Sequence, residues 1–588
     1  MKRREFMMSA GLLGAEFGAG ALFAQEGAPV QDPVERMTAG SAPSIAMCHA
    51  GFRPDSAKMV VYRLKGGMEP KQFAMYDVGS GPQFRIERPL KKIASDFGDC
   101  LIGEFTDIAR EGLYQVKIGD ERSVPFFIRP DAWRRTLPKA VGYHKWQRCG
   151  VEVPNVHKVC HLDDARRRDN GQHVDETGGW HDAGDLRKWM SATMMNGFGL
   201  LQVARNLGEK WDLAGSGLAP IREEVKWGNS YFLKMQDTDG RVWADVAGGL
   251  NGDNSDNHWT DNQIGTADDR YLNTKKTGLI QAMFVALEAM MAQEFRDADP
   301  AYSQQCLKAG LRCWAANQRE GSTRDLSWWA IASLELHRAT NRDLYAVTAA
   351  LIADQIVGLQ ERDFAHGQKQ VRGYWRASAT DTDPYKDTLD SSLPAYVLLE
   401  SARAYPQHKN AGRWRDAVKL YLDEYVFPMT ARSAYRILPY GLFAGSPTPE
   451  TYRPLAGELT YRYFMPVRKH YSWLGLNSHY QCCALVLATA ARDLGRPEYR
   501  NLAYRQIEWI VGANPFAASM MTGEGMRNPY PHSRYVGLIP GGIMNGICGN
   551  ANDEPVLDTE YGLTWRTNEY WSPHVAYYEW AHSVLESA

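Results

Sequence analysis

Two features are scarce in this sequence: net charge, and long hydrophobic runs beyond the N-terminus. The net charge is −2 over 588 residues, so the chain lacks the basic surface that nucleic acids and anionic membranes require. No stretch after residue 24 reaches the length of a transmembrane helix. We see no strict repeat period and no glycine-rich anion loop with basic partners. These absences argue against a nucleic-acid-binding protein, an integral membrane protein and a phosphate-dependent enzyme. A monomer is the default expectation.

Aromatic side chains, in contrast, are abundant. The chain has 18 Trp and 29 Tyr, and 44% of its residues are hydrophobic, so a sizeable core can form. Core packing explains many of these rings. The remainder exceed ordinary core needs, and flat aromatic faces stack well on sugar rings.

The N-terminus has the pattern of an export signal. Arg3 and Arg4 are followed by Phe6, and an apolar stretch rich in Ala and Gly continues to Ala24. That stretch is too short for a good membrane span. The paired arginines predict the bacterial twin-arginine route, cleavage of residues 1–24, and a periplasmic or secreted protein without stable membrane association. An uncleaved signal anchor is the alternative.

Residues 42–131 have the pattern of a small β domain. Residues 59–62 and 112–118 alternate as strands do, residues 124–128 close the series, and Gly and Pro turns separate the runs. This pattern predicts an immunoglobulin-like β-sandwich. Such a domain can bind a ligand, but we expect it to brace its neighbour.

Residues 135–588 form a second region, which is mainly helical. Apolar residues recur at helical spacing, and loops rich in Gly, Pro, Asn and Asp lie between the helices. A long run of helices with elaborate loops is typical of an (α/α) barrel, although a bundle or a solenoid fits the propensities equally well. The helices are expected at residues 276–295, 326–336, 344–356, 392–404, 414–425, 480–494 and 498–511.

Two carboxylates stand three residues apart in a glycine-rich segment. The segment reads Gly178-Gly179-Trp180-His181-Asp182-Ala183-Gly184-Asp185. Both carboxylates can point into one space, and the glycines let backbone and substrate approach closely. Inverting hydrolysis of a glycosidic bond needs a carboxylate base that deprotonates water and an acid on the other face of the sugar. The alternative is a helix cap, with Asp185 as the N-cap of a helix that starts at Leu186.

Four ordered motifs place this segment in context. They are Gln147-Arg148-Cys149-Gly150 with His157-Lys158-Val159-Cys160-His161, the segment 178–185, Gly512-Ala513-Asn514-Pro515 leading to Pro531-His532-Ser533-Arg534, and Thr567-Asn568-Glu569. Their order resembles glycoside hydrolase family 9, the cellulase family, and the resemblance runs from about residue 42 to the C-terminus. The subgroup with an N-terminal immunoglobulin-like domain is the most similar. The resemblance implies an (α/α)6 barrel for residues 135–588.

The resemblance also implies residue roles. Asp185 matches the general base, Asp182 the carboxylate that helps hold the water, and Glu569 the general acid. His532 and Arg534 match residues that contact sugar hydroxyls. The general acid must be protonated at working pH, so we expect burial or nearby negative charge to raise the pKa of Glu569. The alternative for Glu569 is a carboxylate at a helix start.

The sequence departs from the family after Glu569. The family commonly continues with an aliphatic stretch and Asn-Ala, whereas this chain reads Tyr570-Trp571-Ser572-Pro573-His574-Val575. The wall beside the acid is therefore bulkier, and we expect Tyr570 and Trp571 to contact substrate. The stretch between Gly525 and His532 is also one residue shorter than the usual spacing in the family. These differences put a standard endo-cellulase in doubt.

A metal-binding set lies in the same region. Cys149, Cys160, His161 and His181 offer two thiolates and two imidazoles, which is a closed tetrahedral zinc set and therefore a structural one. The spacing is not that of a standard finger, but related enzymes of the subgroup bind zinc at matching positions. A disulfide between Cys149 and Cys160 is the alternative, because the protein is expected to be exported. Zinc would hold the loop that carries both aspartates.

Residues 251–262 form an oxygen-rich loop. Such loops can bind calcium, and related enzymes often do, although the EF-hand pattern does not match. The alternative is a loop at the rim of the cleft. His258 and Trp259 are then expected to touch sugar.

The leading hypothesis is inverting hydrolysis of β-glucans, most simply β-1,4-glucan. The first alternative is an exo-acting β-glucosidase or β-glucosaminidase on short oligosaccharides. The second is a non-catalytic carbohydrate-binding protein, against which the retained Asp182, Asp185 and Glu569 argue. A phosphorolytic enzyme is a third alternative, and it lacks a phosphate pocket.

Overall fold

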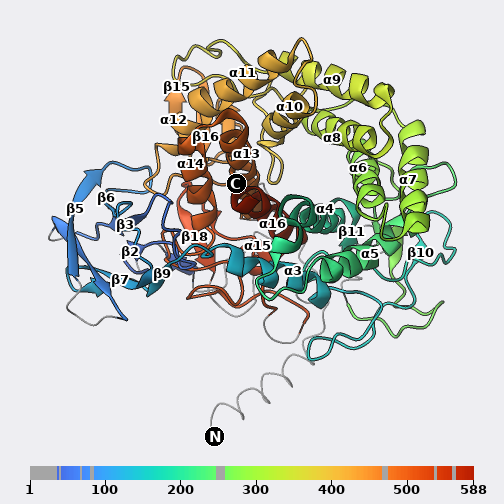
Figure 1. The fold of residues 1–588 in the computed structure, drawn as a ribbon, viewed down its shortest axis with the longest axis horizontal. Coiled ribbons are helices and arrows are strands. Elements are labelled where there is room, and N and C mark those ends of the chain that lie inside the picture. The colour runs from blue at the N-terminus through green and yellow to red at the C-terminus, as the bar shows by residue number, and fades with distance from the viewer. Residues whose placement is uncertain are drawn as a thin grey trace, which may run out of the picture.

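The computed structural model places a small β domain beside a ring of helices (Figure 1). It describes residues 36–38, 42–66, 69–79, 85–246, 258–466, 475–535, 539–558 and 565–587. The export signal predicted for residues 1–24 and the calcium ligands predicted within residues 251–257 lie outside these residues. No helix in the described ranges combines the length and the apolarity that a membrane crossing requires.

The β domain is a folded antiparallel sheet with the strand order β2-β3-β6-β5-β4-β7-β8, and β9 also pairs with β7. Its strands are β2 (Ile45–Ala46), β3 (Met59–Arg63), β4 (Gln72–Asp77), β5 (Arg85–Ile93), β6 (Cys100–Glu104), β7 (Gly112–Ile118), β8 (Glu121–Arg122) and β9 (Phe126–Ile128). The long strand β5 pairs with β4 through its first half and with β6 through its second half. The strands predicted at 59–62 and 112–118 match β3 and β7, and β9 covers the end of the third predicted run.

Aromatic rings fill the space inside the folded sheet. Phe52 meets Phe105 and Phe126 edge-on, with ring centroids 5.4 and 5.6 Å apart. Phe73, Phe105 and Phe126 are at most 1% exposed. Burial of these rings gives the domain its own hydrophobic core.

Six helices form a closed inner ring, in which each packs on the next and the last packs on the first. They are α4 (Met190–Leu207), α6 (Gly278–Glu294), α8 (Thr323–Thr340), α10 (Leu393–Ala404), α13 (Asn477–Leu494) and α16 (Ser572–Ser587). A second set covers the ring from outside, each member packing on an inner helix. It comprises α3 (Leu137–Trp146), α5 (Ala219–Lys234), α7 (Pro300–Ala315), α9 (Asp343–Gly358), α11 (Ala411–Tyr421) and α14 (Pro497–Glu508). Figure 1 shows both layers.

Local sequence explains where these helices begin and how they pack. The hydroxyl of Ser322 accepts from the backbone N–H of Asp325, and Asp325 accepts in return from Ser322, which forms a capping box at the start of α8. Asp299 caps α7 by accepting from Tyr302. Helix α6 is buried on almost every side, as an inner-layer helix must be. The seven predicted helices correspond to α6, α8, α9, α10, α11, α13 and α14.

Short strands and helical turns complete the chain. They are β1 (Arg36–Thr38), β10 (Arg166–Arg167), β11 (Lys188–Trp189), β12 (Asp245–Val246), β13 (Tyr271–Asn273), β14 (Gly441–Ala444), β15 (Arg453–Ala456), β16 (Leu459–Arg462), β17 (Cys548–Gly549), β18 (Pro555–Asp558), α12 (Phe427–Thr430) and α15 (Trp565–Asn568). A π-helical turn, Leu422–Val426, joins α11 to α12. Strand β1 pairs with β18, so chain that precedes the β domain joins a sheet near the C-terminus.

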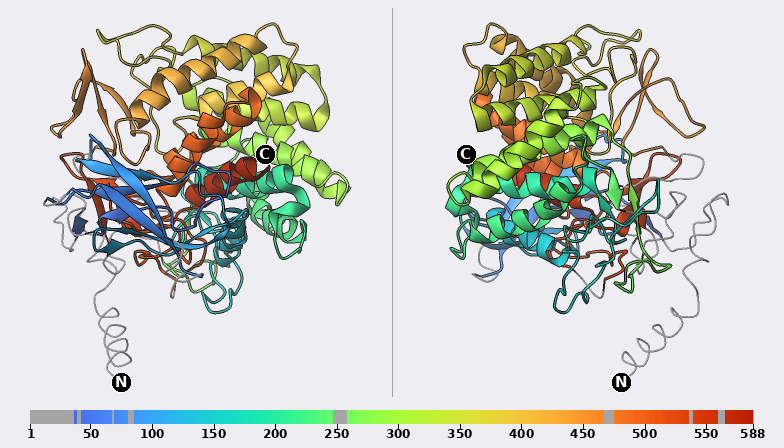
Figure 2. Two further views of the ribbon diagram at one scale, coloured as in Figure 1. Left: turned by 60° about the vertical axis from the view of Figure 1, so that its left-hand side comes forward. Right: turned by 90° about the vertical axis from the view of Figure 1, so that its right-hand side faces the viewer.

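The β domain packs against the side of the ring (Figure 2). The backbone N–H of His49 donates to the carbonyl of Val511 at 2.8 Å. Asp96 accepts hydrogen bonds from the hydroxyls of Tyr461 and Tyr463. Arg53 pairs with Glu586 on α16 at 3.1 Å. These contacts tie the domain to the inner ring and to the β14–β16 sheet, which suits the bracing role.

Candidate active site

The loop before α4 carries both aspartates of the glycine-rich segment. The backbone N–H of Asp182 donates to the carbonyl of Arg187 at 2.7 Å and closes the loop. Leu186 has a φ of 70°, a left-handed conformation that other contacts must hold. The guanidinium of Arg270 donates to the Leu186 carbonyl at 2.5 Å and supplies one of them. The helix begins only at Met190, so the alternative that Asp185 is an N-cap is wrong.

Asp182 lies at the bottom of this loop and is 2% exposed. One carboxylate oxygen accepts from the backbone N–H of Trp189 at 3.1 Å, and the other accepts from the indole N–H of Trp571 at 2.8 Å. Burial, and then the charge of Asp185, raise the pKa of Asp182 to about 8. The two donors hold this carboxylate in one orientation.

Asp185 is the more accessible of the two carboxylates, with its side chain 25% exposed. Its Oδ2 lies 3.0 Å from Nε of Arg187. The Arg187 guanidinium in turn lies over the Trp189 ring, 5.0 Å from its centroid. Our sequence interpretation missed Arg187, although its position two residues after the second aspartate could have identified it as a partner of that carboxylate.

Glu569 lies between α15 and α16 and is 8% exposed. Its backbone carbonyl accepts from the N–H of Asn545 at 2.7 Å, which fixes the main chain. Its Oε1 is buried and has no hydrogen-bond partner among the described residues. Burial, followed by the charges of Asp185 and Asp182, raises the pKa of Glu569 well above its usual value. This is the direction expected for a general acid. The helix that contains Val575 begins at Ser572, so Glu569 itself lies outside that helix.

Residues 531–535 bring the predicted motifs together. The backbone N–H of Arg534 donates to the carbonyl of Gly184 at 2.8 Å, and that of His532 donates to the carbonyl of Asn568 at 3.2 Å. One side of the segment therefore contacts the aspartate loop and the other contacts the residue before Glu569. His532 and Arg534 are half-buried here, and their contact with sugar hydroxyls stays a prediction.

Gly184 is required for this close approach. A Cβ at residue 184 would lie 2.5 Å from the carbonyl oxygen of His532 and 2.9 Å from Cα of Ser533. We expect Gly184→Ala to push segment 531–535 away and to lower kcat by about 10- to 100-fold, because small misplacements of catalytic groups are costly. Steady-state kinetics would measure this. Gly142→Ala is the control, since a Cβ at residue 142 meets nothing within 4 Å, and wild-type kcat in G184A would contradict the expectation.

The remaining predicted substrate contacts differ in accessibility. Trp259 is 38% exposed, but its ring stacks on those of His157 and His161, so its contact with a sugar stays a prediction. His258 is half-buried, and its Nε2 lies 3.2 Å from the carbonyl of Asp268. Tyr570 is fully buried, and its hydroxyl bonds to that of Ser533, so its predicted contact with substrate is wrong because it has no free surface. Trp571 is partly exposed and holds Asp182, a role that the sequence did not predict.

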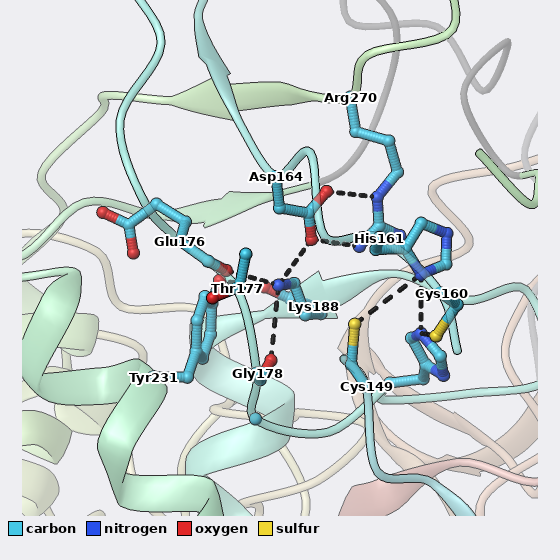
Figure 3. A network of polar contacts seen from close by, with 12 residues as sticks. Cys149, Cys160, His161, Asp164, Glu176, Thr177, Gly178, Lys188, Tyr231 and Arg270 are labelled. Carbon is cyan, nitrogen blue, oxygen red and sulfur yellow. Dashed lines mark hydrogen bonds and ion pairs between the residues drawn. The ribbon is translucent and has the colours of Figure 1, made fainter. Parts of the chain in front are cut away.

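The four predicted metal ligands converge in a buried cluster, and Figure 3 labels three of them, Cys149, Cys160 and His161. Cys149, Cys160, His161 and His181 each offer one ligand atom, and these atoms all lie within 4.8 Å of one another. The two imidazole nitrogens are 3.2 Å apart, and Sγ of Cys149 lies 3.6 Å from Nδ1 of His161. Tetrahedral zinc places two nitrogen ligands about 3.3 Å apart, and nitrogen and sulfur about 3.5 Å apart. The donor set therefore fits this ion.

The hydrogen bonds of the two histidines suit metal ligation. Nε2 of His161 lies 3.0 Å from the carbonyl of His258 and donates to it, which leaves Nδ1 free. Nδ1 of His181 lies 2.5 Å from the hydroxyl of Tyr535, which leaves Nε2 free. Ligating histidines usually donate their second N–H in this way. All nine cysteines are described and free, so the alternative Cys149–Cys160 disulfide does not form.

A buried ionic group lies beside the cluster (Figure 3). Asp164 accepts from Nε and Nη2 of Arg270 at 2.9 and 2.6 Å, and from Nζ of Lys188 at 2.6 Å. All three side chains are at most 1% exposed. Lys188 also donates to the carbonyls of Glu176 and Gly178. These bonds hold the segments before and after the aspartate loop, and our sequence interpretation missed all three residues.

A second group could hold a cation. Asp163, Asp268 and Asp269 offer carboxylate oxygens that lie within 4.8 Å of one another. This group lies beside the predicted calcium loop, since the hydroxyl of Thr260 donates to Asp163 at 2.7 Å. The carboxylates are consistent with a hard cation such as calcium.

Comparison with protein families gives a match over most of the helical region, which includes the aspartate loop and the motif at residues 531–534 but not Glu569. The model described as Glycosyl hydrolase family 9 matches residues 133–539. A cellodextrinase of Butyrivibrio fibrisolvens is 30% identical over 165 residues, which cover 25% of this chain and 30% of that protein. Endoglucanase D of Acetivibrio thermocellus is 30% identical over 236 residues, 35% of each chain. The chain thus spans about a third of the length of these curated relatives.

Solved structures share the fold at low identity. A metagenome-derived glycoside hydrolase family 9 endoglucanase has a TM-score of 0.69 at 22% identity, covering 92% of this chain and 99% of that one. A Zn-binding triple mutant of the family 9 endoglucanase J30 has a TM-score of 0.65 at 22% identity, covering 91% and 99%. Both matches cover more than nine-tenths of this chain.

Proposed function

Because the chain belongs to glycosyl hydrolase family 9, we propose that it hydrolyses β-glycosidic bonds in β-glucans, most simply β-1,4-glucan, with inversion at the anomeric carbon. Asp185 acts as the general base and removes a proton from the attacking water. Asp182 helps to hold that water, and Glu569 protonates the departing glycosidic oxygen. At the end of the reaction Asp185 carries the proton from water and Glu569 has lost its own, and proton exchange with solvent restores the starting state of both.

One observation carries this proposal: the two kinds of carboxyl group lie in different environments. Glu569 is buried, its Oε1 has no partner among the described residues, and its pKa is raised by burial and by the two aspartates. Asp185 is more exposed and lies against the Arg187 guanidinium, which stabilises a carboxylate. A buried carboxyl that keeps its proton and a more exposed carboxylate in contact with a cation can serve as the acid and the base of one reaction.

The substrate class is supported by the curated relatives. One that is 30% identical is a cellodextrinase and another is an endoglucanase, names that point to cleavage of β-1,4-linked glucose chains. The cellodextrinase favours the second candidate, an exo-acting enzyme on short oligosaccharides such as a β-glucosidase or β-glucosaminidase. The bulky wall of Trp571 beside the acid is consistent with that candidate.

We further propose that the two helix layers are the (α/α)6 barrel of this family and that residues 42–131 are an immunoglobulin-like sandwich. Six inner helices in a closed ring, each covered from outside, support the barrel. The antiparallel strands that pack around Phe52, Phe105 and Phe126 support the sandwich.

We propose that Cys149, Cys160, His161 and His181 hold a structural zinc ion. Bound zinc would supply a fixed tetrahedral anchor for its four ligands and leave no open position for chemistry. Since Asp182 follows His181 directly, that anchor holds the aspartate loop. Calcium in the oxygen-rich loop 251–262, export by the twin-arginine route to the periplasm or medium, and a monomeric state are proposals that rest on the sequence pattern.

Metal removal is expected to destabilise the protein. A chelator that strips zinc should lower the Tm, because binding at a thousandfold excess over Kd stabilises the folded state by about 4 kcal/mol. Scanning calorimetry with elemental analysis measures both quantities. Cys149→Ser should reproduce the loss, and Cys548→Ser, which changes a buried cysteine outside the cluster, should not. A zinc-free protein with the Tm of the untreated one would contradict the zinc site.

The deciding experiment for the function is a time-resolved product profile on soluble β-glucans, cello-oligosaccharides, chitobiose-type substrates and aryl glycosides. NMR should show the α-anomer of the new reducing end first. Early release of the β-anomer would overturn inversion. Random internal cleavage of a polymer would overturn the exo candidate, whereas release of single units from one end would favour it.

A further inference from the structure

Tyr535 occupies a junction that the proposed chemistry leaves unexplained. It directly follows the Pro531-His532-Ser533-Arg534 motif and is 6% exposed. Its hydroxyl donates to Oε1 of Gln147 and accepts from Nδ1–H of His181, at 2.5 Å in each case. A single hydroxyl therefore joins residues 531–535 to a candidate metal ligand and to the end of α3.

The segment that Tyr535 anchors lies between the two halves of the catalytic centre. On one side it bonds to Gly184, within the aspartate loop, and on the other to Asn568, directly before Glu569. The position of this segment therefore helps to set the separation of the base from the acid. In inverting glycosidases that separation must leave room for the attacking water.

Tyr535 also contacts the acid side through its ring. The ring stacks on that of Tyr570, with centroids 6.4 Å apart and an interplanar angle of 20°. The backbone N–H of Tyr535 donates to Oγ of Ser533 at 3.0 Å, and that hydroxyl bonds to the hydroxyl of Tyr570. Tyr570 follows Glu569 in the chain, so the contacts of Tyr535 reach the general acid.

We propose that Tyr535 is a positioning residue that couples the Cys149/Cys160/His161/His181 cluster to the general acid. Its hydroxyl orients His181 as a metal ligand, and its backbone and ring hold segment 531–535 at the distance from Glu569 that catalysis needs. The cluster then organises both sides of the catalytic centre, the aspartate side through His181 and the acid side through Tyr535. This inference rests on the proposed function for its kinetic part and on the metal cluster for the rest.

Loss of the Tyr535 hydroxyl is expected to be costly because it would leave buried polar groups without a hydrogen-bond partner. In Tyr535→Phe the ring remains, but Nδ1–H of His181 loses its acceptor and Oε1 of Gln147 loses its donor. Both residues are fully buried, so water cannot easily replace the hydroxyl. Partners of metal-ligating histidines typically contribute 10- to 100-fold to metal affinity. Segment 531–535 also loses the hydrogen bond that ties it to His181.

The first measurement is independent of activity. Wild-type protein and Y535F are loaded with zinc and titrated with a chromogenic chelator. We expect Y535F to release zinc at about 10- to 100-fold lower chelator concentration. Tyr421→Phe is the matched control, because it removes a buried tyrosine hydroxyl that bonds to Ser392 at the start of α10. That variant should keep the wild-type zinc affinity.

The second measurement separates positioning of the acid from general loss of structure. With zinc saturating, Y535F should lose about tenfold in kcat on cello-oligosaccharides. It should lose clearly less on a dinitrophenyl cellobioside, whose leaving group needs little protonation. Tyr570→Phe should show the same kinetic pattern with wild-type zinc affinity, because the hydroxyl that it removes bonds to Ser533 and not to a candidate metal ligand.

Three results would overturn the proposal. One is equal zinc affinity in Y535F and wild type, and another is a wild-type chain that binds no zinc. The third is an equal kcat loss of Y535F on both substrate types, which would indicate a merely structural role. An inactive wild-type enzyme would instead overturn the proposed function, and the chelator titration would still decide the link to the metal.

Discussion

Replacement of Glu569 by glutamine is expected to lower kcat on β-1,4-glucan by about 100- to 10,000-fold, the range that general acid catalysis contributes. The amide would keep the shape of the side chain but could not deliver a proton to the departing oxygen. The loss should be much smaller on a dinitrophenyl cellobioside, since its leaving group departs as a stable anion. Steady-state kinetics on the two substrates measures the difference.

The pH dependence of this variant provides an independent test. Burial and two neighbouring aspartates raise the pKa of Glu569 in the folded protein, so its carboxyl stays protonated when the unfolded chain has already ionised. The contribution of Glu569 to the free energy of unfolding is fully present below its pKa in the unfolded chain, about 4.3. That contribution is lost as pH rises through the pKa of Glu569 in the folded protein. The Tm of E569Q should therefore exceed that of wild type by more as pH increases. The basic limb of wild-type activity should move or vanish in E569Q.

A matched control is Glu498→Gln on α14, where the carboxylate is exposed and pairs with Arg496. This variant should keep wild-type kcat and pH profile, because surface ion pairs contribute little. If E569Q retained wild-type turnover on glucan, the assignment of the general acid would be wrong.

The sequence predicted seven of the helices and missed others for physical reasons. Helices α7 and α9 lie in the outer layer, yet only α9 was predicted, because apolar residues dominate it. Helix α4 is buried on nearly all sides, like the predicted α6, but Gly197 and Gly199 lower its helix propensity. Strand β5 reads RIERPLKKI and is exposed or half-exposed along its length, so no alternation of buried residues identifies it.

The residues of the candidate site also divide into those that the sequence predicted and those that it missed. The motif residues Asp182, Asp185 and Glu569 could be identified because local spacing and order carry that information. Tyr535 and Arg270 could not, because they act through contacts between segments that lie far apart in the chain, such as the bond from Arg270 to Leu186. Tyr570 was misassigned for the same reason, since its burial depends on residues 531–535. Composition cannot reveal which way a side chain faces.

The second large effect is expected for Asp185→Ala. Loss of the base should lower kcat on glucans and on aryl cellobiosides alike by about 100- to 10,000-fold, because water is no longer deprotonated whatever the leaving group. The side chain of Asp185 is 25% exposed, so its removal leaves a space that solvent can reach. Asp416→Ala, at an exposed carboxylate on α11, is the control and should keep full activity.

A small external nucleophile should restore turnover in D185A. Azide needs no deprotonation and can attack the anomeric carbon from the side that Asp185 served, while Glu569 protonates the departing oxygen and the C–O bond breaks. Because attack comes from the face opposite the leaving group, a β-linked substrate should give the α-glycosyl azide. NMR of the product distinguishes the anomers. A β-glycosyl azide would require two displacements through a covalent enzyme intermediate, and would replace the inverting mechanism with a retaining one at this same pair of carboxyl groups.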